Sequence, residues 1–157
     1  MKVSELFVIV GLVTIIGFGG FSCVKSFMNT RDKDMQAAYF EKGGKTLAVE
    51  VDVTGGWTVD DKLGTAYISN GKTENGEAVT ALAAPIDKMT YYNCEKNSRA
   101  KGAHQQYVYG GVLYTAPSGD SMFIKQLGKN EFFQISASHV SQAQLSEVVS
   151  RVELKYI

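Results

Sequence analysis

Nineteen consecutive residues near the N-terminus, Leu6 to Val24, carry no charge, and this stretch constrains the fold of the chain more than any other feature. A helix rises about 1.5 Å per residue, so this stretch would span about 28 Å, close to the hydrocarbon thickness of a bilayer, about 30 Å. The sequence therefore predicts a membrane anchor over residues 1–24. The anchor side chains are Leu6, Val10, Val13, Ile16, Phe18 and Phe21.

Two other interpretations of this stretch stay open. In a cleaved signal peptide, Leu6–Ile16 would be the apolar core, and Gly20 and Ser22 the small residues before the cut. A lipid-attachment site at Cys23 would need an aliphatic residue three positions earlier, where Gly20 stands. We favour a retained helix, because the basic start is weak and because apolar residues continue at helical spacing as far as Tyr39.

The continuing pattern predicts an amphipathic helical stalk over residues 25–44, which the glycine pair Gly43-Gly44 ends. Lys25, Arg31 and Lys33 come after the apolar stretch, and the positive-inside rule would place the C-terminal domain in the cytoplasm. An N-terminal anchor before a folded domain more often exports that domain. We adopt this tendency and expect a single-pass protein of a bacterial cell membrane with its domain on the periplasmic or extracellular side.

Residues 45–157 predict one soluble α+β domain. The segment KTLAVEVDV alternates apolar and polar residues, as a half-buried strand does. Further strands are predicted for the segments GTAYISN, EAVTALAA, QQYVYGGVLYTA, SMFIKQL and EFFQISA, the last three as an antiparallel meander. One helix is expected from Pro85 to Lys101, closed by Gly102, and a second from the cap Ser141, with Val152 on its apolar face. The fold expected is a twisted antiparallel sheet covered by one or two helices.

Several function classes are excluded or disfavoured by composition. Lys+Arg and Asp+Glu balance at 16 each, so no nucleic-acid partner is expected. The two histidines are not in metal-ligand spacing, and no metal or other cofactor is expected. Cys94 has no neighbouring histidine in the sequence, which indicates a half-buried thiol rather than a nucleophile. The sequence therefore predicts a protein that is not an enzyme.

Two sets of residues are candidates for contacts with other proteins. Gly19 and Cys23 have the small-xxx-small spacing that allows helices to approach closely in a membrane, although glycine is also common in membrane helices generally. Tyrosine is enriched at protein interfaces, and the domain holds more tyrosines than its core needs. The predicted partner surface consists of Tyr91, Tyr92, Tyr107 and Tyr109.

Two family resemblances bear on these expectations. The segment NEFFQISASHVSQAQLSEVVSRVEL, a strand, a short loop and a capped helix, resembles the final unit of small bacterial envelope domains of the photosystem-II-P-protein-like fold. That resemblance implies an α+β fold used for binding or accessory roles. Glu5 followed by LFVIVGLVTIIG resembles the start of a mature type IV pilin or pseudopilin, which implies assembly through the N-terminal helix with Glu5 setting the register.

We therefore expect a membrane-anchored, non-enzymatic binding protein whose partners are the lipid bilayer and a second protein. A subunit of a membrane complex, an inhibitor and an immunity-type protein all fit this description. The alternative is a pilin-like structural subunit.

Overall fold

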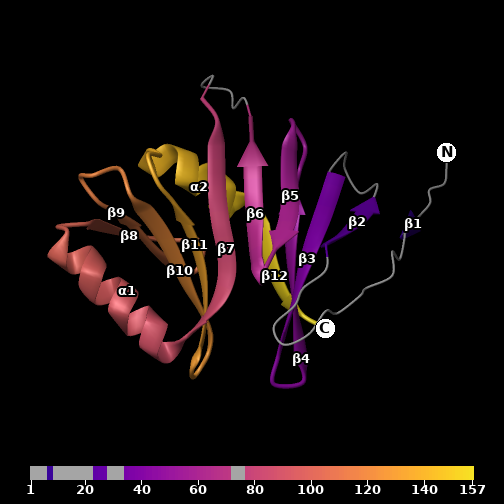
Figure 1. Ribbon diagram of the computed structural model, residues 1–157, viewed down its shortest axis with the longest axis horizontal. Helices are drawn as coiled ribbons and strands as arrows, with labels where there is room; N and C mark the ends of the chain where they lie inside the picture. Colours follow the sequence, from indigo (N-terminus) through magenta and orange to yellow (C-terminus); the bar gives the residue numbers. More distant parts are fainter. Residues whose placement is uncertain (1–6, 9–22, 28–33, 72–76) are drawn as a thin grey trace. The chain divides into compact units, whose positions relative to one another are not determined.

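A computed structural model describes residues 7–8, 23–27, 34–71 and 77–157 of the chain. Two compact units are present, and each is described by itself below. The first comprises residues 1–78 and 151–157, and the second comprises residues 79–150. Two helices and antiparallel strands make up the described residues, so the α+β class expected from the sequence is confirmed (Figure 1).

The first unit is built on an antiparallel sheet of five strands in the order β1-β2-β3-β4-β12. A separate antiparallel pairing joins β5 to β6 in the same unit. The strands are β1 (Phe7–Val8), β2 (Cys23–Phe27), β3 (Asp34–Lys42), β4 (Lys45–Asp52), β5 (Trp57–Lys62), β6 (Thr65–Asn70) and β12 (Val152–Tyr156).

The alternation of β4 accounts for the core of this unit. Leu47, Val49 and Val51 are buried on one face of the strand, as the sequence pattern predicted. Trp57 is buried too, and the Arg151 guanidinium lies 5.0 Å from the centre of its ring. Arg151 therefore joins β5 to the start of β12 through a cation–π contact with Trp57.

The second unit has a five-stranded antiparallel arrangement in the order β7-β11-β10-β9-β8. Helix α1 comes after β7 in the sequence and precedes β8, and helix α2 comes after β11 (Figure 1). The elements are β7 (Val79–Asp87), α1 (Lys88–Ala100), β8 (His104–Val108), β9 (Gly111–Thr115), β10 (Ser121–Gly128), β11 (Glu131–Ala137) and α2 (Gln142–Ser150).

The two faces of this sheet carry different side chains because successive residues of a strand point to opposite faces. The α1 face holds the buried cluster Tyr114, Met122, Ile124 and Phe132, against which residues of α1 pack. Buried residues of β9, β10 and β11 that alternate with these lie on the other face, which α2 covers. They are Leu113, Phe123, Phe133 and Ile135.

The predicted capping box of α2 is confirmed. The Gln144 amide N–H donates to Ser141 Oγ at 3.1 Å, and the Ser141 amide N–H donates to Gln144 Oε1 at 2.7 Å. The predicted pairing of β9, β10 and β11 is also confirmed.

Four sequence-based expectations about local structure are wrong. The helical stalk expected over residues 25–44 is absent where the structure describes the chain, because β2 and β3 are strands paired to each other. The first helix begins at Lys88 rather than at Pro85, which still pairs with Phe133 in the sheet. The segment QQYVYGGVLYTA forms two strands rather than one, and Val152 belongs to β12 rather than to the last helix.

The anchor side chains Leu6, Val10, Val13, Ile16, Phe18 and Phe21 lie outside the described residues, as does Gly19. Cys23 lies in β2, opposite Ala38 of β3. Within the described parts of the chain, neither helix is both long enough and apolar enough to cross a bilayer. The continuous helix that the pilin resemblance implied does not extend through Asp34–Lys42, where β3 stands.

Candidate functional site

Helix α1 covers only part of its face of the second unit. Asp87 caps its first turn by accepting a hydrogen bond from the Thr90 amide N–H at 2.7 Å. None of the residues of α1 is fully buried, although a helix on a sheet normally buries an apolar stripe. The main contact between α1 and the sheet is made by Tyr91, whose ring stacks on Phe132 with 4.2 Å between the ring centres. The sheet face is consequently hollowed at two places beside the helix.

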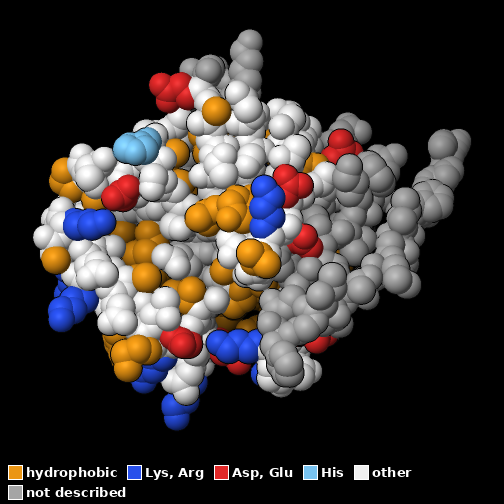
Figure 2. All heavy atoms as spheres, in the orientation of Figure 1, with side chains coloured by type: hydrophobic (Ala, Val, Ile, Leu, Met, Phe, Trp, Pro, Cys, Tyr) orange, Lys and Arg blue, Asp and Glu red, His pale blue; other side chains and the backbone are white. Residues whose placement is uncertain are grey.

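One hollow, of about 400 Å³, is rich in aromatic side chains, and we call it the tyrosine groove. It is lined by Tyr91 of α1, by the β8–β9 hairpin and by side chains of the sheet beneath. Figure 2 shows hydrophobic side chains at the surface on the side where Figure 1 places α1, with Lys and Arg side chains near them. The hairpin and sheet residues of the lining are Tyr107, Val108, Tyr109, Gly110, Gly111, Val112, Tyr114, Ile124, Gln126 and Phe132.

The turn between β8 and β9 positions two of these tyrosines. Tyr109 and Gly110 both have positive φ, 51° and 74°, as both central residues of a type I′ hairpin turn do. This turn lets the strands continue with Val108 opposite Gly111. Tyr107 is left 81% exposed and Tyr109 53% exposed, an unusual amount of aromatic surface to leave in water.

The structure brings three of the four predicted tyrosines to this groove, namely Tyr91, Tyr107 and Tyr109. Tyr92 is not part of the lining, but its ring is 5.4 Å from that of Tyr91 and is half exposed. Tyr109 does not share a strand face with Tyr107, because it lies in the turn between β8 and β9. Tyr114, by contrast, is buried and forms the floor.

Burial and neighbouring charge keep the inner tyrosine hydroxyls neutral. Burial, followed by the negative charge of Glu95, raises the pKa of Tyr114 to about 12. The same two causes, in the same order, raise the pKa of Tyr91. Glu95 itself pairs with Arg99 at 2.7 Å. At neutral pH the hydroxyls of Tyr91 and Tyr114 are therefore uncharged and can donate and accept hydrogen bonds.

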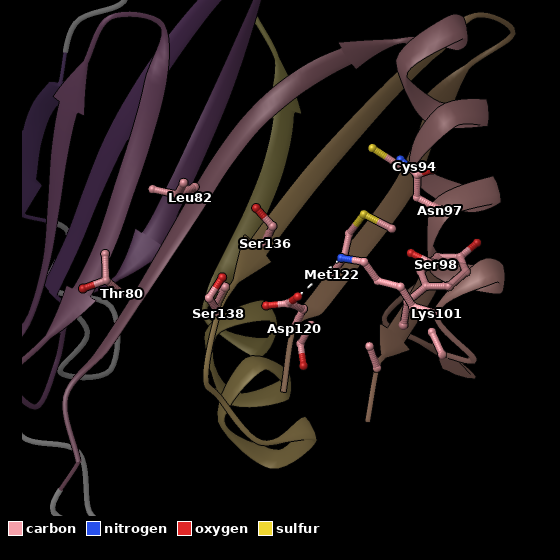
Figure 3. A pocket seen from close by; sticks show the side chains of 15 residues that line it. Thr80, Leu82, Cys94, Asn97, Ser98, Lys101, Asp120, Met122, Ser136 and Ser138 are labelled. Atoms are coloured by element: carbon pink, nitrogen blue, oxygen red, sulfur yellow. Dashed lines mark hydrogen bonds and ion pairs between the residues drawn. The ribbon is translucent and has the colours of Figure 1, made fainter. Parts of the chain in front are cut away.

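The second hollow, of about 480 Å³, lies between α1 and β7, and we call it the polar cleft (Figure 3). The two elements are joined at Asp87, and they diverge from there (Figure 1). The floor of the polar cleft comes from β9, β10 and β11. The lining comprises Thr80, Leu82, Cys94, Asn97, Ser98, Lys101, Ala103, Tyr114, Ala116, Asp120, Ser121, Met122, Ser136, Ala137 and Ser138.

The polar groups of this cleft bind one another. Lys101 Nζ lies 3.4 Å from Asp120 Oδ2, and hydrogen bonds from Lys101 and then from Ser138 lower the pKa of the Asp120 carboxyl. Gln134 donates to Met122 Sδ at 3.0 Å and to Cys94 Sγ at 3.7 Å. Neither His104 nor His139 is among the lining residues of the cleft. The arrangement offers groups that can form hydrogen bonds.

The polar cleft was not predicted from the sequence, although the spacing of polar residues in and after β11 indicates it. Gln134, Ser136 and Ser138 are spaced two apart, and the first two share a face of β11 with Phe132. Polar residues at such positions indicate a face that its covering helix leaves open at one end. The partners from β7 and α1 lie far away in the sequence, and no local pattern connects them.

Within the described residues, no group of three or more His, Cys, Asp and Glu side chains could hold a metal ion. Comparisons of the chain with protein-family models, with curated proteins and with solved structures found no match.

Proposed function

We propose that the protein is a membrane-anchored binding protein without catalytic activity, which holds a protein partner in the tyrosine groove. The observation that carries this proposal is the convergence of Tyr91, Tyr107 and Tyr109 on one hollow of about 400 Å³. Tyrosine combines a large apolar ring with a hydroxyl that can form hydrogen bonds, and for that reason it is favoured where proteins meet. In this role, as an accessory or inhibitory subunit of a membrane complex, the protein would bind its partner through this surface.

The anchoring part of the proposal rests on the uncharged stretch of the sequence. If β2 keeps its place in the sheet from Cys23 onward, the residues left for the anchor are Leu6–Ser22. Seventeen residues are at the lower end of what a membrane helix needs, about 17 to 25. In the anchored protein the pairing of Phe7–Val8 with β2 would be replaced by helix.

Site-specific photo-crosslinking in cells tests the binding role. A photoreactive amino acid replaces Tyr109 in the full chain, and a matched control carries it at Tyr156, which is exposed to a similar degree in β12. We expect an adduct of one discrete mass from position 109 and none from position 156. The second variant Tyr107→Ala, combined with the probe at 109, should reduce the adduct. Equal adducts from both positions, or none from position 109, would refute the proposed surface.

A further inference from the structure

Strand β8 is an open edge of the second unit. It ends the strand order β7-β11-β10-β9-β8, and within the described residues no strand pairs with its outer side. Proteins usually protect such edges with lysine, proline or a bulge. β8 has none of these, because its sequence is His-Gln-Gln-Tyr-Val and its register with β9 is continuous. The edge is therefore open to pairing with another strand.

The two-residue turn determines which backbone groups of β8 face outward. In such a hairpin the residues that flank the turn, Val108 and Gly111, form a hydrogen-bonded pair. Hydrogen-bonded and non-hydrogen-bonded pairs then alternate along the ladder, so Gln106 bonds to β9 and its two neighbours do not. The N–H and C=O groups of Gln105 and Tyr107 consequently point away from the sheet.

The open edge and the tyrosine groove are adjacent. The side chain of Tyr107 lines the groove, while its backbone groups face the free edge. On the opposite face, Gln106 accepts a hydrogen bond from Gln142 of α2, so that side of β8 is occupied. A strand added to β8 would therefore place alternate side chains over the groove.

Charge on the face opposite the groove selects the kind of strand. Lys125 follows Ile124 of the groove along β10, so its side chain lies on the opposite face of the sheet, where it passes beside Gly110 at the end of β8. Acidic side chains of an added strand that point to this face are complementary to Lys125, whereas a second copy of this chain would bring its own Lys125 to the same edge.

We propose that the partner presents an acidic, extended segment that pairs with β8 as a sixth strand and places an apolar side chain in the tyrosine groove. This inference rests on the proposed binding role and adds its mode and the chemistry of the partner. In this mode the outward N–H and C=O groups of Gln105 and Tyr107 give affinity, and the groove selects the side chain.

The test uses the full chain in detergent and a fluorescein-labelled peptide of alternating Glu and Val with one central Phe, with fluorescence anisotropy as the readout. Gln105→Pro removes an outward N–H without removing a bond to β9. Tyr156→Pro is its matched control, because the alternation of β12 against β4 places the Tyr156 N–H on the outer side of that strand. We expect Gln105→Pro to weaken binding about tenfold or more, and Tyr156→Pro to leave it unchanged. Replacing Glu by Lys in the peptide should abolish binding.

The outcomes separate this inference from the proposed function. If Tyr109→Ala weakens peptide binding and Gln105→Pro does not, the groove binds but strand addition is wrong. No binding of the peptide to the wild type overturns the inference, while crosslinking at position 109 still decides the binding role. Sedimentation that shows a dimer, lost in Gln105→Pro, would mean that a second copy occupies the edge and would overturn the acidic partner. Protection of the Gln105 and Tyr107 amides from hydrogen exchange on peptide binding would support it.

Discussion

Tyr114 shows how one side chain can link the core to the tyrosine groove. Its ring is buried within the cluster beneath α1, yet the residue lines both hollows. Gly111, on the same strand, allows β9 to approach β10 closely. A Cβ at Gly111 would lie 2.6 Å from the Ile124 carbonyl oxygen and 2.6 Å from the Phe123 ring. Only glycine allows that approach, because no other residue lacks a Cβ.

The raised pKa of Tyr114 gives a prediction about stability at high pH. Below about pH 10 the hydroxyl is neutral in both the folded and the unfolded chain, so its ionisation has no effect. Between about pH 10 and about pH 12 the unfolded chain loses the proton first, and the free energy of unfolding falls by about 2–3 kcal/mol in total. Urea unfolding at about pH 9 and about pH 11 measures about half of this fall, and the measured difference should be smaller in Tyr114→Phe. An equal fall in both proteins would contradict the assignment.

Individual tyrosines could be predicted from the sequence as candidates for a partner surface, but the surroundings of each side chain could not. Tyr91 and Tyr92 are neighbours on one helix, and yet Tyr91 stacks on Phe132 while Tyr92 is half exposed. That difference depends on Phe132, about forty residues downstream. Sequence composition indicated an excess of tyrosine, and only the fold shows which of them meet.

At the scale of elements, the sequence correctly predicted features that depend only on residues close together in the chain. The alternation of β4 and the capping box of α2 involve residues close together in the sequence, and both are confirmed. The expected single strand from Gln105 to Ala116 is wrong, because Tyr109-Gly110 can adopt positive φ at both turn positions. A Tyr-Gly pair is a weaker signal for that turn than Asn-Gly or Asp-Gly.

The capping box of α2 gives a prediction at this scale. Ser141→Ala removes the oxygen that accepts from the Gln144 amide N–H, and we expect it to lower the free energy of unfolding by about 1 kcal/mol. Ser141→Asp keeps an acceptor at the cap and should retain most of the stability. Urea unfolding of the three proteins at neutral pH provides the measurement. Equal losses in Ala and Asp variants would mean that the cap hydrogen bond is not the cause.

At the scale of the whole molecule, the proposed anchor predicts where the protein is found. We expect the intact mass of the purified protein to match the full chain, and we expect the protein in the membrane fraction. Ile16→Lys places a charge within the apolar stretch, which costs about 2.5–3.5 kcal/mol at the centre of a membrane helix, and should move protein to the soluble fraction. Thr58→Lys, on an exposed position of β5, is the control. A soluble product shortened by about twenty residues would instead identify a cleaved signal peptide.

The sequence could not reveal the long-range pairings of the molecule. Met35, Ala38 and Tyr39 of β3 have helical spacing, but pairing on both sides with β2 and β4 outweighs that local pattern. The sequence does not predict β12 because its partner is distant: Lys155 lies opposite Ala48 and binds Glu50 at 2.7 Å. A periodicity test compares neighbours along the chain, and it contains no information about such pairs.

The pairing of β12 with β4 also bears on how the protein is made. The ribosome delivers β4 early, but the strand that covers its second edge is completed only when Tyr156 has been added. The second unit, residues 79–150, is continuous in sequence and can fold while the first unit still lacks that strand. Throughout that interval the nascent chain exposes an unpaired edge of β4, with Leu47, Val49 and Val51 beside it. Chaperone binding during translation would therefore be concentrated on the part of the protein that was synthesised first.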